Sequence, residues 1–191
     1  MAIPGEVDLR AERHAVVATL ESLSDAEFES GTTLCTEWAP RDILAHLMGV
    51  DTGLIEYAKA PGKIGKANAA IVAKARPMSR ERIMNRARHW ADKPATLTRV
   101  TALFFLGDTA VHHQDILRGL GRTRDVPDAC RAAILREGIV LGGKKLLSFR
   151  VEPTDGGRAM GRGTVVRGTS EALGLWLTGR AGIEPELEFA D

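Results

Sequence analysis

One stretch of the chain decides how the rest is interpreted: Leu106-Gly107-Asp108-Thr109-Ala110-Val111-His112-His113-Gln114-Asp115-Ile116-Leu117-Arg118. The apolar residues around it predict a helix over residues 97–117. Because an α-helix turns about 100° per residue, Asp108 and His112 are roughly 40° apart and share one face, whereas His113 points away. A carboxylate and an imidazole at this spacing can bind one ion without bending the helix.

Phe104 and Val111 lie on the same side as Asp108, so we expect this side of the helix to be buried. An ionised aspartate without a partner is costly inside a protein, and a metal ion or another cation is the usual partner. Asp115 is an alternative to Asp108, because it is three residues from His112. It could orient a ligand, or it could form an ion pair with Arg118.

His46 can complete this set. It lies close to the apolar stripe of a helix predicted over residues 41–59, whose inward positions are Ile43, Leu47, Val50 and Leu54. If the two helices pack together, His46, Asp108 and His112 offer two imidazoles and one carboxylate, a donor set that suits zinc and leaves a coordination position open. The alternatives are a hydrogen-bonded core histidine and a buried ion-pair cluster without metal.

The rest of the chain predicts a mainly α-helical protein. Further helices are expected over 8–23, from a cap at Ser24, over 63–74, from a cap at Ser79 to about 90, and over 127–147. After residue 147 the pattern changes to strands at 149–152 and 164–167, a turn at 155–157, and a helix over 169–178 that stops at Gly179. We therefore expect a four- or five-helix bundle over residues 1–147 and a small extension over 148–191, a β-hairpin plus a helix, packed on the bundle.

Composition excludes several classes of function. The 191 residues include 26 basic and 25 acidic side chains, a formal net charge of +1, so no net positive field favours nucleic acid or a membrane surface. Cys35 and Cys130 form neither a disulfide framework nor a CxxC pair. The chain starts without the pattern of a signal peptide and has no apolar run of the ~20 residues that span a bilayer. We expect a cytoplasmic protein.

Several single residues have two interpretations. Cys35 is a redox thiol or, with more weight, a small loop residue; Trp38 lines a pocket or anchors the loop. Arg180 binds a carboxylate of a substrate or cofactor, or is a surface charge near a helix end. We assign His14 and His89 to the surface or to packing.

Two motifs carry a family resemblance. The segment Thr33-Leu34-Cys35-Thr36-Glu37-Trp38-Ala39-Pro40-Arg41-Asp42-Ile43-Leu44-Ala45-His46-Leu47 and the segment 106–118 resemble the two signatures of the mycothiol-dependent maleylpyruvate isomerase family. The glycine-rich pattern from Thr154 to Arg180 resembles the end of that family's sequences. The family belongs to the DinB/YfiT-like metal-binding four-helix bundles.

The resemblance implies a divalent metal, usually zinc, bound by His46, Asp108 and His112, with mycothiol as thiol cofactor. A cation lowers the pKa of a bound thiol, so the nucleophilic thiolate exists at neutral pH. In the isomerase such a thiolate adds to a conjugated double bond, allows rotation and leaves. The expected function is an isomerase or S-transferase acting on small electrophiles. The alternative is a non-catalytic metal-binding bundle that binds a small molecule or a protein; homodimerisation is an open prediction.

Overall fold

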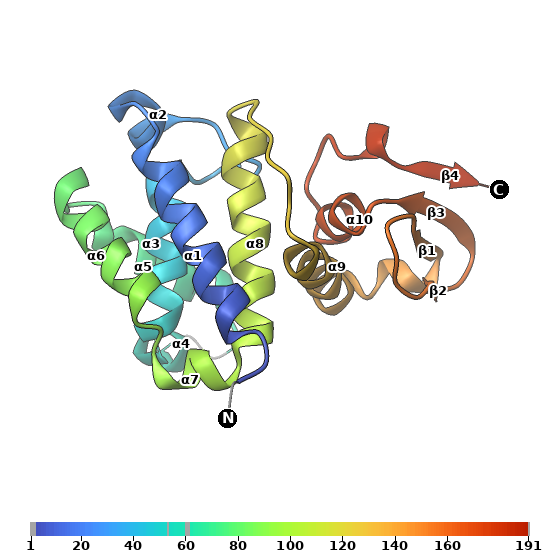
Figure 1. The fold of residues 1–191 in the computed structure, drawn as a ribbon, viewed down its shortest axis with the longest axis horizontal. Coiled ribbons are helices and arrows are strands. Elements are labelled where there is room, and N and C mark those ends of the chain that lie inside the picture. Colours follow the sequence, from blue (N-terminus) through green and yellow to red (C-terminus); the bar gives the residue numbers. More distant parts are fainter. Residues whose placement is uncertain (1–2, 53, 60–61, 191) are drawn as a thin grey trace.

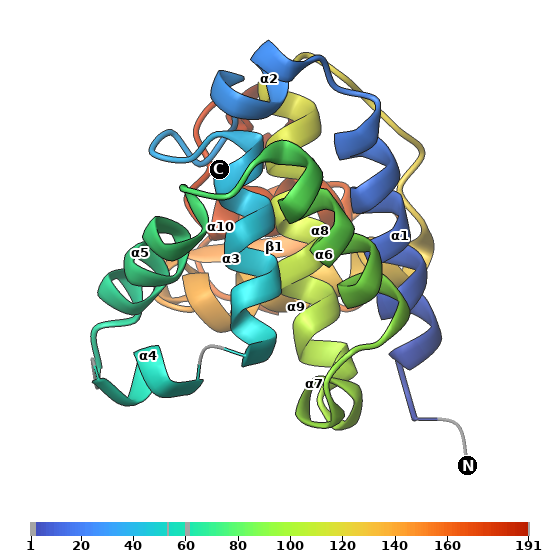
Figure 2. The same cartoon turned by 90° about the vertical axis from the view of Figure 1, so that its left-hand side faces the viewer.

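The N-terminal part of the chain forms a helical bundle (Figure 1). A computed structural model describes residues 3–52, 54–59 and 62–190, without the side chains of residues 52, 54 and 55, so the predicted inward position of Leu54 lies outside the described side chains. The helices of this part are α1 (Glu6–Glu21), α2 (Asp25–Ser30), α3 (Pro40–Thr52), α4 (Leu54–Lys59), α5 (Ile64–Ala75), α6 (Arg80–Asp92), α7 (Thr96–Val100) and α8 (Ala102–Gly119). Helices α1, α6, α3 and α8 pack in this order around one core, as Figure 2 shows from the side.

Local sequence signals start several of these helices where they were predicted. Ser24 caps α2 in a capping box, because its hydroxyl accepts from the Glu27 amide while the Glu27 carboxylate accepts from the Ser24 amide. Pro40 is the first residue of α3, where its missing N–H costs nothing. Ser79 caps α6 through the amide of Arg82.

One long helix that was predicted as continuous is divided. The helix expected over 97–117 is divided at Thr101, which has a non-helical ψ of 26° and donates its hydroxyl to the Leu97 carbonyl at 2.7 Å. This bond competes with the backbone bonds of a continuing helix. Of the helix expected over 41–59, the described residues form α3 up to Thr52 and α4 from Leu54, and residue 53 lies outside the described residues.

The C-terminal part packs a helix pair against a small sheet (Figure 1). Its elements are α9 (Asp128–Gly142), the 3₁₀ helix η1 (Lys145–Leu147), β1 (Phe149–Pro153), β2 (Met160–Gly161), β3 (Thr164–Gly168), α10 (Ser170–Leu177), η2 (Glu184–Glu186) and β4 (Glu188–Ala190). Helix α9 ends five residues before the predicted boundary, at a pair of glycines. A small β-structure plus a helix is confirmed here, so the predicted fold class holds. The division between residues 147 and 148 stays a prediction.

The sheet differs from the predicted hairpin in one respect. Its order is β2-β1-β3-β4, and β1 pairs with β2 in an antiparallel hairpin but with β3 in parallel. Because β2 and β3 lie on opposite sides of β1, the chain between them must pass the start of β1. It does so at Gly161 and Gly163, which have φ values of 89° and 92°. A Cβ atom at either position would lie 2.2 Å from a backbone carbonyl oxygen, of Phe149 or Ser148. Only glycine permits this crossing.

Helix α9 joins the two parts, because it packs against α8 on one side and α10 on the other. A second core, between α8, α9, α10 and the sheet, includes the fully buried Ile134, Val151, Val166 and Leu173. No helix within the described ranges combines the length and the hydropathy needed to cross a bilayer.

Candidate functional site

Helices α3 and α8 bring His46, Asp108 and His112 together, as the sequence predicted. One donor atom from each lies within 4.8 Å of the other two. Asp108 Oδ1 is 3.6 Å from His46 Nε2 and 3.6 Å from His112 Nε2. These distances are too long for hydrogen bonds. Two ligands of one tetrahedral ion, each about 2.1 Å from it, are about 3.4 Å apart, so the spacing fits a shared cation.

The other nitrogen of His112 is fixed by Asp115. His112 Nδ1 and Asp115 Oδ2 are 2.9 Å apart, so Nδ1 donates and Nε2 is left to face Asp108. Asp115 is fully buried and also accepts two hydrogen bonds from Arg180, at 3.0 and 2.7 Å. Of the two interpretations of Asp115, orientation of His112 agrees with the geometry, because Arg118 pairs instead with Glu171 and Glu186.

Arg180 reaches this place because of the way α10 ends. Gly179 adopts φ 86°, and the amides of Gly179 and Arg180 bond back to Trp176 and Leu175 in a Schellman motif. The helix stop predicted at Gly179 thereby directs Arg180 towards α8, and its side chain is only 14% exposed. Arg180 is therefore not the surface charge of one earlier interpretation.

Within the site, opposite charges stabilise the ionised forms of His112 and Asp108. Burial alone would lower the pKa of His112, but its bonds to Asp115 and Cys35 and the charge of Asp108 outweigh this, and the pKa rises to about 10. Burial would raise the pKa of Asp108, yet the neighbouring histidines and Arg180 bring it below its ordinary value. Without a cation, His112 is therefore protonated at neutral pH, and a metal ion must displace that proton.

His46 is positioned by packing. Its Nδ1 is buried and has no hydrogen-bond partner among the described residues. The Trp38 ring lies against it, with 4.9 Å between ring centroids, and is 5.9 Å from the His112 ring. Trp38 thus both lines the site and anchors the loop before α3, where its carbonyl accepts from the Thr33 hydroxyl.

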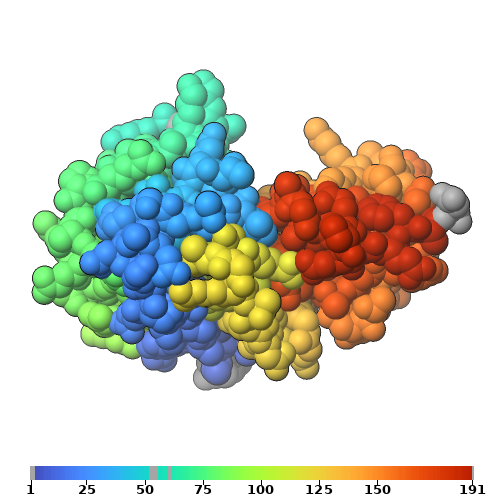
Figure 3. Space-filling model, turned by 90° about the horizontal axis from the view of Figure 1, so that it is seen from above, coloured from blue at the N-terminus to red at the C-terminus, as the bar shows by residue number. Residues whose placement is uncertain are grey.

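The three donors lie in the wall of a cavity of about 420 Å³ between the bundle and the C-terminal part. On the face seen in Figure 3, the surface is notched between the α4–α5 segment and the C-terminal part. The lining residues are Cys35, Trp38, His46, Val50, Tyr57, Ile64, Asn68, Phe104, Asp108, Val111, His112, Glu137, Leu141 and Arg180. A ligand can therefore approach the donor atoms from the cavity.

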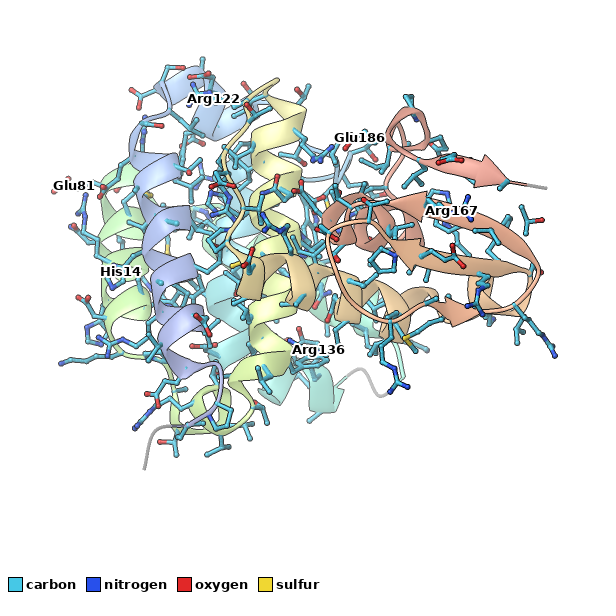
Figure 4. The ribbon with its side chains drawn as sticks, turned by 45° about the vertical axis from the view of Figure 1, so that its right-hand side comes forward. His14, Glu81, Arg122, Arg136, Arg167 and Glu186 are labelled. Atoms are coloured by element: carbon cyan, nitrogen blue, oxygen red, sulfur yellow. The ribbon has the colours of Figure 1, made fainter. Side chains whose placement is uncertain are left out.

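Phe104 corrects one sequence inference. It was expected to be buried, but 52% of it is exposed, because it lies in the first turn of α8, at the edge of the cavity. The histidines assigned to the surface or packing are confirmed: His89 is exposed, and His14 lies on the outer face of α1 with half of its side chain in solvent (Figure 4). His113 points away from the site and bonds to Glu12 and Thr19.

Sequence reasoning passed over two residues of this site. Cys35 was treated mainly as a loop residue, yet its Sγ is 3.2 Å from Asp115 Oδ2 and 3.7 Å from Arg180 Nη2. Glu137 was not considered at all, although it interrupts an apolar helix face three residues after Ile134. That interruption was the available signal.

Together the fold and the site define a helical-bundle protein with a candidate metal centre in a cavity. Residues 9–103 match the family model described as mycothiol maleylpyruvate isomerase N-terminal domain, and the chain belongs to this family. A search of curated proteins found no match.

Two solved structures share the fold. Crystal structures of the mycothiol-dependent maleylpyruvate isomerase and of a point mutant superpose with TM-scores of 0.68 and 0.69. They are 14% and 13% identical to this chain, and each comparison covers 96% of this chain and 91% of the other.

Proposed function

We propose that this protein is a thiol-dependent metalloenzyme in which His46, Asp108 and His112 bind one divalent cation, zinc by the nature of the donors. The observation that carries the proposal is the convergence of three donor atoms from α3 and α8 on one point of a cavity wall. Two neutral imidazoles and a carboxylate with an open fourth position form a typical catalytic zinc set.

The surrounding residues support this assignment. Asp115 accepts from His112 Nδ1 and thereby selects the tautomer whose Nε2 can bind a cation. Arg180 balances the buried charge of Asp115, so the carboxylate stays ionised. Without metal the triad is an ion-pair cluster in which Asp108 Oδ1 lies 3.6 Å from each Nε2, beyond hydrogen-bonding distance, whereas this spacing fits a shared cation.

The thiol of the proposal is a low-molecular-weight thiol of the mycothiol type. A bound cation would lower the pKa of that thiol, so that the nucleophilic thiolate exists at neutral pH. The family membership favours mycothiol, and the cavity leaves Asp108 accessible, with 21% of its side chain exposed. The substrates we propose are small electrophiles, converted by isomerisation or by transfer of the thiol.

Metal content tests the proposal. Protein purified without chelators, or refolded with Zn²⁺, is expected to hold one metal ion per chain by elemental analysis. The double variant His46→Ala, His112→Ala is expected to hold none, because a single carboxylate does not retain zinc. The matched control is His14→Ala, His89→Ala, which removes two exposed histidines and leaves the metal content unchanged.

Titration calorimetry with mycothiol then tests the thiol. Binding that disappears after metal removal is the expected result. Metal at background level in the wild type, or full zinc affinity in the double variant, would contradict the metal centre. Thiol binding that is the same with and without metal would contradict the proposed role of the cation.

A further inference from the structure

Glu137 is a buried carboxyl group that the proposed function does not use. It lies on α9, is 7% exposed and lines the same cavity as the three donors. Its Oε2 would be 3.0 Å from a Cβ atom placed on Gly107, so the carboxyl rests on the backbone of α8 next to Asp108. Within the described part of the chain, no side chain or backbone group donates a hydrogen bond to it, so the carboxyl is left to the cavity.

Outside the triad, the described lining residues of the cavity offer no free positive side chain to balance this group. Among its described lining residues, Arg180 alone carries a permanent positive charge, and it is engaged by both oxygens of Asp115. The carboxylates of Asp108 and Glu137 both face the cavity. A divalent cation bound by the triad offsets the charges of Asp108 and of a thiolate bound to that cation, so the charge of Glu137 is left uncompensated. A dianionic substrate would therefore meet repulsion at close range.

The outer part of the cavity is apolar. Ile64, Phe104 and Leu141 line it and are 66%, 52% and 64% exposed, and Val50 and Val111 continue the apolar wall inward. These side chains can cover an apolar ligand body, and the burial of such a body is favourable.

We propose that the cavity selects an uncharged electrophile with an apolar body over a dicarboxylate, and that Glu137 is the residue that excludes the dicarboxylate. This inference rests on the proposed function for the identity of the site, but the selectivity can be measured without turnover. Burial, followed by the charge of Asp108, raises the pKa of Glu137 to about 7, so the carboxyl is largely ionised at pH 8.

The test uses two unreactive probes of the same carbon skeleton, succinate and dimethyl succinate. Their dissociation constants are measured at pH 8 by ligand-observed NMR on the zinc-supplemented protein with saturating mycothiol, so that the thiolate occupies the open zinc position. In the wild type we expect dimethyl succinate to bind at least about tenfold more tightly than succinate. In Glu137→Gln, which keeps the shape and removes the charge, succinate binding is expected to strengthen about tenfold while the diester changes less than about twofold.

Asp128→Asn is the matched control. It removes one negative charge from the same helix, but the Asp128 side chain is 91% exposed and outside the cavity, so the ratio of the two constants should not change. The proposal is overturned if wild-type protein binds succinate as tightly as the diester, if the diester does not bind, or if Glu137→Gln leaves the ratio unchanged. Zinc content and thiol-dependent turnover of the same samples report on the proposed function separately.

Discussion

Asp115 accepts hydrogen bonds from two directions, His112 on α8 and Arg180 after α10. It does not line the cavity, yet its bond to Nδ1 determines which nitrogen of His112 faces the cavity. A carboxylate in this position also makes the imidazole a stronger donor to a cation. The residue therefore acts on the candidate metal centre through its neighbour.

Replacing Asp115 by asparagine is expected to weaken zinc binding about 10- to 100-fold, because the amide can hold His112 in the wrong tautomer and no longer balances Arg180. Competition with a chromophoric chelator measures the affinity. The control variant Glu186→Gln also removes a carboxylate that pairs with an arginine, but Arg118 keeps its bond to Glu171, so zinc affinity should stay at the wild-type value. Equal losses in both variants would contradict the role of Asp115.

At the scale of elements, the contact between α9 and α10 determines where Glu137 and Arg180 lie. The helices meet at glycines: a Cβ atom on Gly174 would be 2.4 Å from the Ile134 carbonyl, and one on Gly138 would be 2.7 Å from the Gly174 Cα. A side chain at either position would force the two backbones apart.

Gly174→Ala is accordingly expected to destabilise the protein by about 1–3 kcal/mol in urea unfolding, since it overpacks this contact. Gly65→Ala is the matched control. It lies in α5 with open space around it, so the better helix propensity of alanine should leave stability unchanged or raise it by up to about 1 kcal/mol. A Gly174→Ala variant as stable as the wild type would mean that the two helices are not held this closely.

The starts of several helices and the pairing of residues within one helix can be predicted from the sequence. Helix starts at Ser24, Pro40 and Ser79 follow from local hydrogen bonds and a fixed φ, and the i, i+4 spacing is enough to place Asp108 beside His112. The parallel pairing of β1 and β3 depends on a backbone crossing at two glycines, which no periodicity records. Glu137 was missed for a similar reason: only the packing of α9 on Gly107 brings it into the cavity.

In the molecule as a whole, a second buried network connects the bundle to the C-terminal part. Glu12 on α1 bonds to His113 on α8 at 2.8 Å, to Arg124 in the loop before α9, and to Cys130 on α9 at 3.3 Å. Burial would raise the pKa of Glu12, but His113 and Arg124 outweigh it and lower the pKa from 4.5 to about 2. The folded state therefore favours the ionised form.

The free energy of unfolding should then decrease as the pH falls from about 4.5 to about 2. The contribution of Glu12, about 3 kcal/mol, is fully present above pH 4.5 and is lost as the pH falls towards 2, because the unfolded chain takes up the proton first. Urea unfolding at pH steps between 6 and 2 measures it. Glu12→Gln should be less stable at pH 6 and show a flatter acid dependence, whereas Glu21→Gln, which removes an exposed ion pair with Arg88, should keep the wild-type slope.

The course of the chain through the site also sets an order of assembly during translation. His46, Asp108, His112 and Asp115 are all synthesised before α9 and α10, and Arg180 follows only after both. Domains tend to fold from the N-terminal side as the chain emerges from the ribosome. A nascent bundle thus holds every cation donor while the guanidinium that later balances Asp115 is still missing. If zinc binds at that stage, metal loading precedes the completion of the fold.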